Sequence, residues 1–209
     1  MTGQTAREDA DVPGSGFRAV RGGGAAARFA AAEAALLRSL AGQVAELVGG
    51  DPPPGGAETA QDTAPPSPSA APDATELEEM FALSDSAALP DDPVLARLLP
   101  DAYPDDPAAA GEFRRYTESS LRSGKVAAAM TLLGTLPENG GRVRLSADEA
   151  QAWLRSLNDI RLALGVRLNV TEDRDDMLAR TGQGGPEAAG LWVYDWLTLL
   201  QETLVEALW

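Results

Sequence analysis

Apolar residues recur at intervals of three or four along much of this chain, which is the spacing of an amphipathic helix. The clearest example covers residues 147–164, where Ser146 and Glu149 form a capping box before a single apolar face. Residues 31–48 and 191–209 repeat the pattern. The whole pattern predicts seven or eight helices: residues 31–48, a short helix from Thr75, one between Pro93 and Pro100, one from Pro107, and residues 124–136, 147–164, 171–181 and 191–209.

The same pattern predicts the buried side of one helix and the loop before the last helix. Phe113, Tyr116 and Leu121 are expected on the buried side of the helix that starts at Pro107. A glycine-rich loop over residues 182–190 is expected to lead into the last helix, whose apolar stripe ends near the terminal Trp209.

Three short stretches read as strands, at residues 17–21, 26–29 and 142–145, and they would have to meet to form a sheet. Gly22–Gly24 joins the first two, and residues 22–27 formally fit the G-x-G-x-x-A pattern of dinucleotide sites. Such a site also needs a parallel β-α-β unit, which the sequence lacks, so a plain hairpin turn is the better interpretation. The predicted fold is mainly α, a single helical domain with a small two- or three-stranded β element.

Residues 51–74 are rich in Pro, Ala, Ser and Gly and lack the apolar residues that would offset the entropy of ordering them. We therefore predict a disordered acidic insert at 51–74, a disordered tail at 1–15, and one domain over 16–209. Residues 51–106 hold thirteen acids and one base, so most of the formal charge of −15 lies in the middle of the chain.

The chain has no cysteine and no histidine, and a single lysine among its 209 residues. A thiolate, a disulfide, an imidazole base and soft metal ligands are therefore excluded. Carboxylate pairs are numerous, but no pair is distinguished by its spacing. We expect no enzyme activity, no cofactor and no metal.

The charge of −15 argues against direct nucleic-acid binding, because phosphate repels a polyanion. The chain has no apolar run of about 20 residues, the length that crosses a membrane. Its polar, acidic beginning lacks the features of a signal peptide, so the expected compartment is the cytoplasm. The sequence gives no oligomeric state.

Two clusters are candidates for binding a protein partner. Arg114, Arg115 and Arg122 could meet an acidic partner, although pairing with acids of the same chain is the favoured alternative. Arg142 and Arg144 could likewise line one face of a strand. The second cluster is aromatic, and packing of the last helix is its alternative explanation; it comprises Trp192, Tyr194 and Trp196.

The helical stretches resemble those of an actinobacterial family of helical proteins, one branch of which is the oxidative stress transcriptional regulator AosR. The two most specific matches are residues 150–170 and 194–208; the others are residues 17–23, 33–48, 92–103 and 112–126.

The resemblance implies a regulator of sulfur and cysteine metabolism genes that contacts a sigma factor or RNA polymerase. It also implies genes nearby for a sulfur carrier and a metal-dependent peptidase, so an adaptor or scaffold for that system is the alternative function. Redox sensing in the AosR branch resembles a cysteine-pair switch, which this cysteine-free chain does not have. Met80, Met130 and Met177 are a possible oxidisable substitute.

Overall fold

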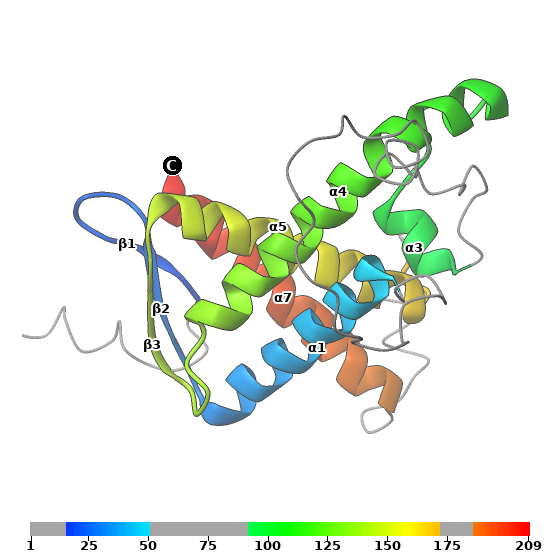
Figure 1. Ribbon diagram of the computed structural model, residues 1–209. Helices are drawn as coiled ribbons and strands as arrows, with labels where there is room; N and C mark the ends of the chain where they lie inside the picture. The colour runs from blue at the N-terminus through cyan, green and yellow to red at the C-terminus, as the bar shows by residue number, and fades with distance from the viewer. Residues whose placement is uncertain (1–15, 51–91, 172–185) are drawn as a thin grey trace, which may run out of the picture.

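The computed structural model describes residues 16–50, 92–171 and 186–209, which form helices beside a small sheet (Figure 1). In chain order these residues form β1 (Arg18–Ala19), β2 (Ala25–Phe29), α1 (Ala31–Gly49), α3 (Pro93–Leu98), α4 (Pro107–Thr135), β3 (Gly141–Leu145), α5 (Ala147–Arg167) and α7 (Pro186–Leu208). The predicted mainly α fold with a small β element is confirmed.

The three strands pair antiparallel in the order β1-β2-β3, so the predicted meeting of the three stretches is confirmed. The predicted hairpin turn is also confirmed, with positive φ angles at all three glycines, Gly22–Gly24. Two features require glycine at position 24. Its φ is +90°, and a Cβ there would lie 2.1 Å from the carbonyl oxygen of Leu145. The glycine lets β2 approach the end of β3.

Acidic and hydroxyl side chains begin α3, α4 and α5, as the sequence indicates. The Asp92 carboxylate accepts a hydrogen bond of 2.7 Å from the Val94 N–H, and Asp106 accepts bonds of 3.1 Å at the start of α4. At α5 the Glu149 carboxylate accepts bonds from the backbone N–H and the hydroxyl of Ser146. These bonds favour the ionised form and lower the pKa of Glu149.

Helix α5 lies at the centre of the described residues, packed against α1, α3, α4 and α7. Its Trp153 is fully buried, and its indole N–H donates a 2.7 Å hydrogen bond to the Thr135 hydroxyl at the end of α4. Phe17 and Phe29 from the sheet contact the Trp153 ring, with centroids 5.6 and 5.8 Å away. This aromatic cluster fastens one face of the sheet to the helices.

Helices α1 and α4 run antiparallel, and each supplies an arginine to the other's C-terminal end. Arg38 of α1 donates hydrogen bonds to the carbonyl oxygens of Leu133 and Leu136. Arg122 of α4 donates a 2.7 Å bond to the carbonyl oxygen of Val48. These guanidinium groups satisfy carbonyls that have no partner within their own helix.

The predicted number of helices needs correction. The described residues contain five helices, not seven or eight, and the predicted helices from Pro107 and over 124–136 are one continuous helix, α4. Gly124 suggested a break, yet its backbone stays helical and a Cβ there would meet nothing within 4 Å. A glycine inside a helix costs only about 1 kcal/mol, which packing of the helix outweighs.

The last helix begins at Pro186, inside the expected loop. Gly190 therefore lies within α7, where a Cβ would come within 2.7 Å of the Leu168 side chain, so close packing explains this glycine. The expected helices at Thr75 and 171–181, the tail at 1–15 and the insert at 51–74 lie outside the described residues, apart from Thr171.

The expected burial of Phe113, Tyr116 and Leu121 is wrong, because all three side chains are exposed. The first half of α4 extends past the other long helices, with α3 beneath it (Figure 1). The side of α4 that is buried there carries small or paired residues, among them Ala110 and Arg114. Periodicity located an apolar face, but no helix within residues 16–50, 92–171 and 186–209 covers it.

Candidate functional site

The arginine cluster predicted for partner binding is largely engaged within the chain. Arg114 is 8% exposed and forms an ion pair with Asp101, just after α3, and a longer one of 3.9 Å with Glu118. Arg122 pairs with the same Glu118 carboxylate at 2.7 Å and also reaches the end of α1. Of the three predicted arginines, Arg115 alone is exposed.

The position of these side chains follows from the helical repeat. Residues 114, 118 and 122 are four apart, so they lie along one side of α4, and that side turns toward α3 and the end of α1. Arg115 is rotated by about 100° and leaves that side. The structure thus divides the predicted cluster into two structural arginines and one surface arginine.

A second ion pair joins α4 to the central helix. The Lys125 ammonium group donates a 2.7 Å hydrogen bond to the Asp159 carboxylate, which is buried in α5. Burial raises the pKa of Asp159, and the hydrogen bond and charge of Lys125 act in the opposite direction. A carboxylate with a raised pKa can suggest catalysis, but this one faces a packed helix rather than a cleft.

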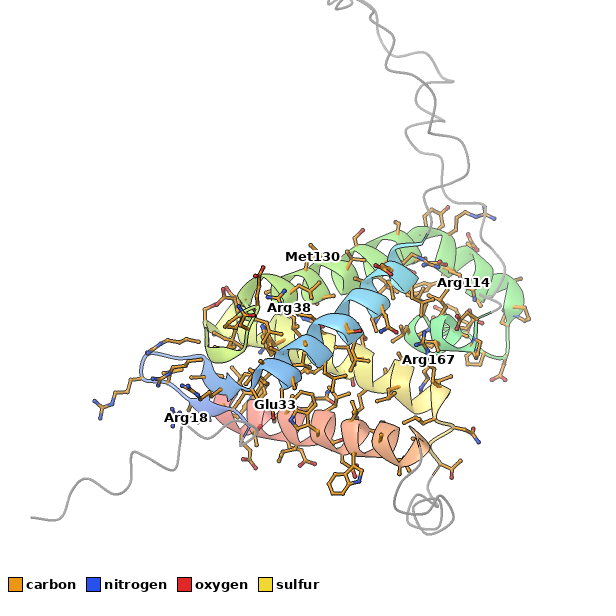
Figure 2. The ribbon with its side chains drawn as sticks, turned by 90° about the horizontal axis from the view of Figure 1, so that it is seen from below. Arg18, Glu33, Arg38, Arg114, Met130 and Arg167 are labelled. Atoms are coloured by element: carbon orange, nitrogen blue, oxygen red, sulfur yellow. The ribbon has the colours of Figure 1, made fainter. Side chains whose placement is uncertain are left out.

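The predicted aromatic cluster on α7 borders an open apolar groove. The groove has a volume of about 290 Å³ and lies between the start of α1 and the middle of α7. We call it the tryptophan groove; its lining residues are Ala32, Glu33, Leu36, Trp192, Val193 and Trp196. Glu33 is seen in Figure 2 between these two helices. The carboxylate of Glu33 accepts a 2.7 Å bond from the Ala30 N–H, so it is held against the helix start.

The two tryptophans of the groove differ in burial. Trp192 is 74% exposed, so core packing does not explain it. Trp196 is half-buried and its ring contacts Phe29 edge-on at 6.5 Å, while its indole N–H is buried without a hydrogen-bond partner. Together they form an apolar wall with one unsatisfied donor.

Tyr194 does not line the groove with Trp192 and Trp196. The Arg161 guanidinium lies 5.9 Å from the centre of the Tyr194 ring, and the ring edge rests on Gly165. Tyr194 therefore helps to fasten α7 to α5. The structure brings Trp192 and Trp196 together at one groove and places Tyr194 and the α4 arginines elsewhere.

The described residues offer little to reaction chemistry. They contain no group of three or more acidic side chains that could hold a metal ion. Two smaller hollows, one between α1 and α5 and one beside Arg114, have volumes of about 30 Å³, room for water rather than a substrate. No helix in the part of the chain that the structure describes is both long and apolar enough to cross a membrane.

The sequence did not single out Arg18 and Arg28, which the fold places on the sheet, apart from both α4 and the tryptophan groove. Arg18 of β1 and Arg28 of β2 share the outer face of the sheet with Arg142 and Arg144, which the sequence had placed on one face of a strand. The alternation of a strand was the available signal, but β1 and β2 are too short for it to be decisive.

Comparison with known proteins gives one family and several relatives. The family described as Domain of unknown function (DUF2017) matches residues 14–208. An oxidative stress regulator AosR from Mycobacterium tuberculosis is 38% identical over 187 residues, covering 83% of this chain and 77% of the relative. The regulator of the same name from Mycobacterium bovis gives the same values.

A relative from Mycobacterium leprae, with a provisional form of the same name, is 43% identical over 136 residues and covers 59% of this chain and 61% of its own length. No solved structure matches the chain. The tryptophan groove and the sheet face both lie within the matched range of the family.

Proposed function

The chain belongs to the DUF2017 family, and on that premise we propose that it is a non-enzymatic regulator linked to the oxidative stress response. The names of its mycobacterial relatives support a regulatory role. The absence of cysteine and histidine from the sequence supports a role without catalysis.

The proposed regulator acts by contact with a sigma factor, alone or within RNA polymerase. The observation that carries this proposal is Trp192, a large aromatic side chain that is 74% exposed at the rim of an apolar groove. Exposed tryptophans beside grooves are frequent anchors of protein interfaces, because the indole ring buries a large area with few rotatable bonds. The half-buried Trp196 extends the apolar wall of the same groove beside it.

Charge supports a protein partner over direct DNA binding. The whole chain carries −15, so a DNA duplex would repel it, whereas the basic surfaces of a DNA-binding protein would attract it. The proposed contact is thus steered by charge and anchored by Trp192.

This proposed regulator does not carry a cysteine switch of its own, because it has no cysteine. In our proposal the response to oxidation lies in another molecule, and this chain supplies a constant binding surface. An oxidised methionine is the remaining route, and it would change polarity rather than form a bond.

The proposal is tested by purifying the tagged full chain from the native organism and identifying the bound proteins. We expect the unmodified chain to recover a sigma factor with or without polymerase subunits. Trp192→Ala should weaken that recovery by about 30-fold, which corresponds to about 2 kcal/mol of hot-spot energy. Trp209→Ala is the matched control, because Trp209 is 84% exposed but lies outside the groove.

Two results would contradict the proposal. Recovery of only a peptidase or a sulfur carrier would favour the adaptor or scaffold alternative. Equal loss of a sigma factor with Trp192→Ala and Trp209→Ala would show that the groove is not the contact.

A further inference from the structure

The outer face of the three-stranded sheet carries a compact set of arginines. In the register of the sheet, Arg18 and Arg144 flank Ala26 on its two sides, and Arg28 lies directly opposite Arg142. Side chains alternate between the faces of a strand, so these arginines lie on the side away from Phe17, Phe29 and the helices. We call this set, Arg18, Arg28, Arg142 and Arg144, the arginine face.

The burial of Ala26 is accounted for if long side chains of its neighbours lie over it. Ala26 lies on the outer side of the central strand, yet it is only 1% exposed. Its register neighbours are Arg18 and Arg144, whose aliphatic stems can lie over it while their charged ends stay in water. Figure 2 shows Arg18 at the sheet end of the molecule.

Two of these arginines provide exposed charge that no acid of the described residues neutralises. Arg142 and Arg144 are exposed, and none of the ion pairs of the described residues includes them. Arg18 and Arg28 have further contacts within the chain, so the argument rests first on Arg142 and Arg144.

The protection of sheet edges does not account for the whole set. Charged residues on edge strands prevent sheets from joining, which would explain Arg18 on β1 and arginines on β3. Arg28, however, belongs to the central strand and faces Arg142 directly. Edge protection therefore does not explain the arginine at this central position.

The charge of the molecule is also less uniform than the total suggests. Residues 16–50, 92–171 and 186–209 together hold fourteen bases and sixteen acids, a net charge of −2. The remaining −13 belongs to the other segments of the chain. Against this nearly neutral part of the chain, the exposed Arg142 and Arg144 give the sheet a positive surface.

We propose that the arginine face binds an extended acidic segment of a partner protein, with carboxylates on alternate residues. Arg142 and Arg144 are two residues apart on one strand, which separates them by about 7 Å. Carboxylates on alternate residues of an extended peptide have the same spacing. Each guanidinium can then hold one carboxylate through two parallel hydrogen bonds.

The surface fits a peptide better than a nucleic acid. Single-stranded nucleic acids bind where basic residues surround aromatic rings on which the bases stack. Both phenylalanines beside this sheet, Phe17 and Phe29, are buried on the opposite face. The arginine face shares no residue with the tryptophan groove, so it would be a second contact, independent of the sigma-factor proposal.

The test measures binding of a fluorescent peptide of about ten residues, with glutamate alternating with threonine, to the full chain. A peptide with glutamine in place of glutamate reports binding that does not depend on charge. We expect the double variant Arg142→Gln and Arg144→Gln to weaken binding of the glutamate peptide by about tenfold, from the loss of two charge-assisted pairs. The matched control is Arg97→Gln with Arg155→Gln, two exposed helical arginines that change the net charge equally.

The outcomes separate cleanly. Equal weakening by both double variants, or equal binding of the glutamine peptide, would overturn the proposal. Tighter binding of a single-stranded oligonucleotide of similar length would identify a nucleic-acid surface instead. If the double variant fails to fold, the salt dependence of the unmodified chain decides: binding must weaken steeply as salt rises, and constant affinity would contradict a site made of arginines.

Discussion

The ammonium group of Lys125, the only lysine of the chain, lies 2.7 Å from a carboxylate oxygen of Asp159. Asp159 belongs to the central helix α5 and is 4% exposed, and Lys125 reaches it from α4. The pKa of Asp159 is raised because the cost of burying its charge exceeds the stabilisation that Lys125 provides. The pair therefore joins α4 to α5, and the buried Asp159 carboxylate depends on Lys125 for its counter-charge.

Replacing Lys125 with methionine should lower the free energy of unfolding by about 3 kcal/mol, because it leaves a buried carboxylate without a counter-charge. Chemical denaturation at neutral pH measures the change. The control is the double variant that also carries Asp159→Asn, which removes the buried charge and should recover most of the loss. A Lys125→Met protein as stable as the unmodified chain would show that the pair contributes nothing.

The loss caused by Lys125→Met should shrink in acid. A raised pKa means that the folded state holds a proton on Asp159 at pH values above the ordinary 3.8, where the unfolded chain is already ionised. The contribution of this group to stability therefore falls as pH rises through that window. Without Lys125 the pKa of Asp159 should rise further, so the folded and unfolded states differ in protonation over a wider pH range. Comparing unfolding free energies of the two proteins at pH 7 and about pH 4.5 measures the difference, and an equal loss at both values would contradict this account.

Gly24→Ala should destabilise the sheet by about 2 kcal/mol or more, because the new Cβ would overlap the carbonyl oxygen of Leu145 and the backbone would be held at φ +90°. Gly22→Ala is the matched control. Its φ of +92° is equally strained, but its Cβ would meet nothing within 4 Å, so its loss should be about 1 kcal/mol. Thermal unfolding measures both, and equal losses would show that the contact with β3 is unimportant.

Local signals in the sequence were sufficient for the starts of α3, α4 and α5, but not for that of α7. Asp92, Asp106 and Ser146 were identifiable because a cap acts on neighbours two or three residues away. The continuity of α4 was not identifiable, because the cost of Gly124 is local whereas the contacts of Arg122 and Lys125 that hold the helix reach other elements. Sequence periodicity also could not show that the Tyr116 side of α4 is left exposed by the described helices.

The candidate site illustrates the same limit. Arg114 and Arg115 are adjacent in the sequence, yet one is buried in ion pairs and the other is exposed. Trp192 and Leu197 both belong to the apolar helix α7, and the difference in their burial depends on how α7 packs against α5 and the sheet, which the sequence of α7 does not show. Sequence patterns indicate which residue types are present, but the packing of the helices determines which of them remain exposed to a partner.

Thiol-specific oxidants should leave the mass of this chain unchanged, because it has no cysteine to oxidise. Hydrogen peroxide should convert Met130 to its sulfoxide, since this side chain is 58% exposed on the outer side of α4 (Figure 2). The melting temperature should stay the same, because the added oxygen would remain in water. Mass spectrometry and thermal unfolding before and after treatment measure this, with Met130→Leu as the control. A fall in the melting temperature of the unmodified chain, absent from Met130→Leu, would show that Met130 is structurally sensitive.

The most direct test of the proposed function uses the absence of cysteine, which allows a photo-crosslinker to be placed at one chosen position. Ala32→Cys puts it on the wall of the tryptophan groove, and Ser120→Cys puts it on an exposed part of α4 as the control. After incubation with purified RNA polymerase and its sigma factors, we predict a crosslink to a sigma factor or polymerase subunit from position 32 and none from position 120. Absence of a crosslink at position 32, or equal crosslinking from both positions, would contradict the proposal that this groove contacts the transcription machinery.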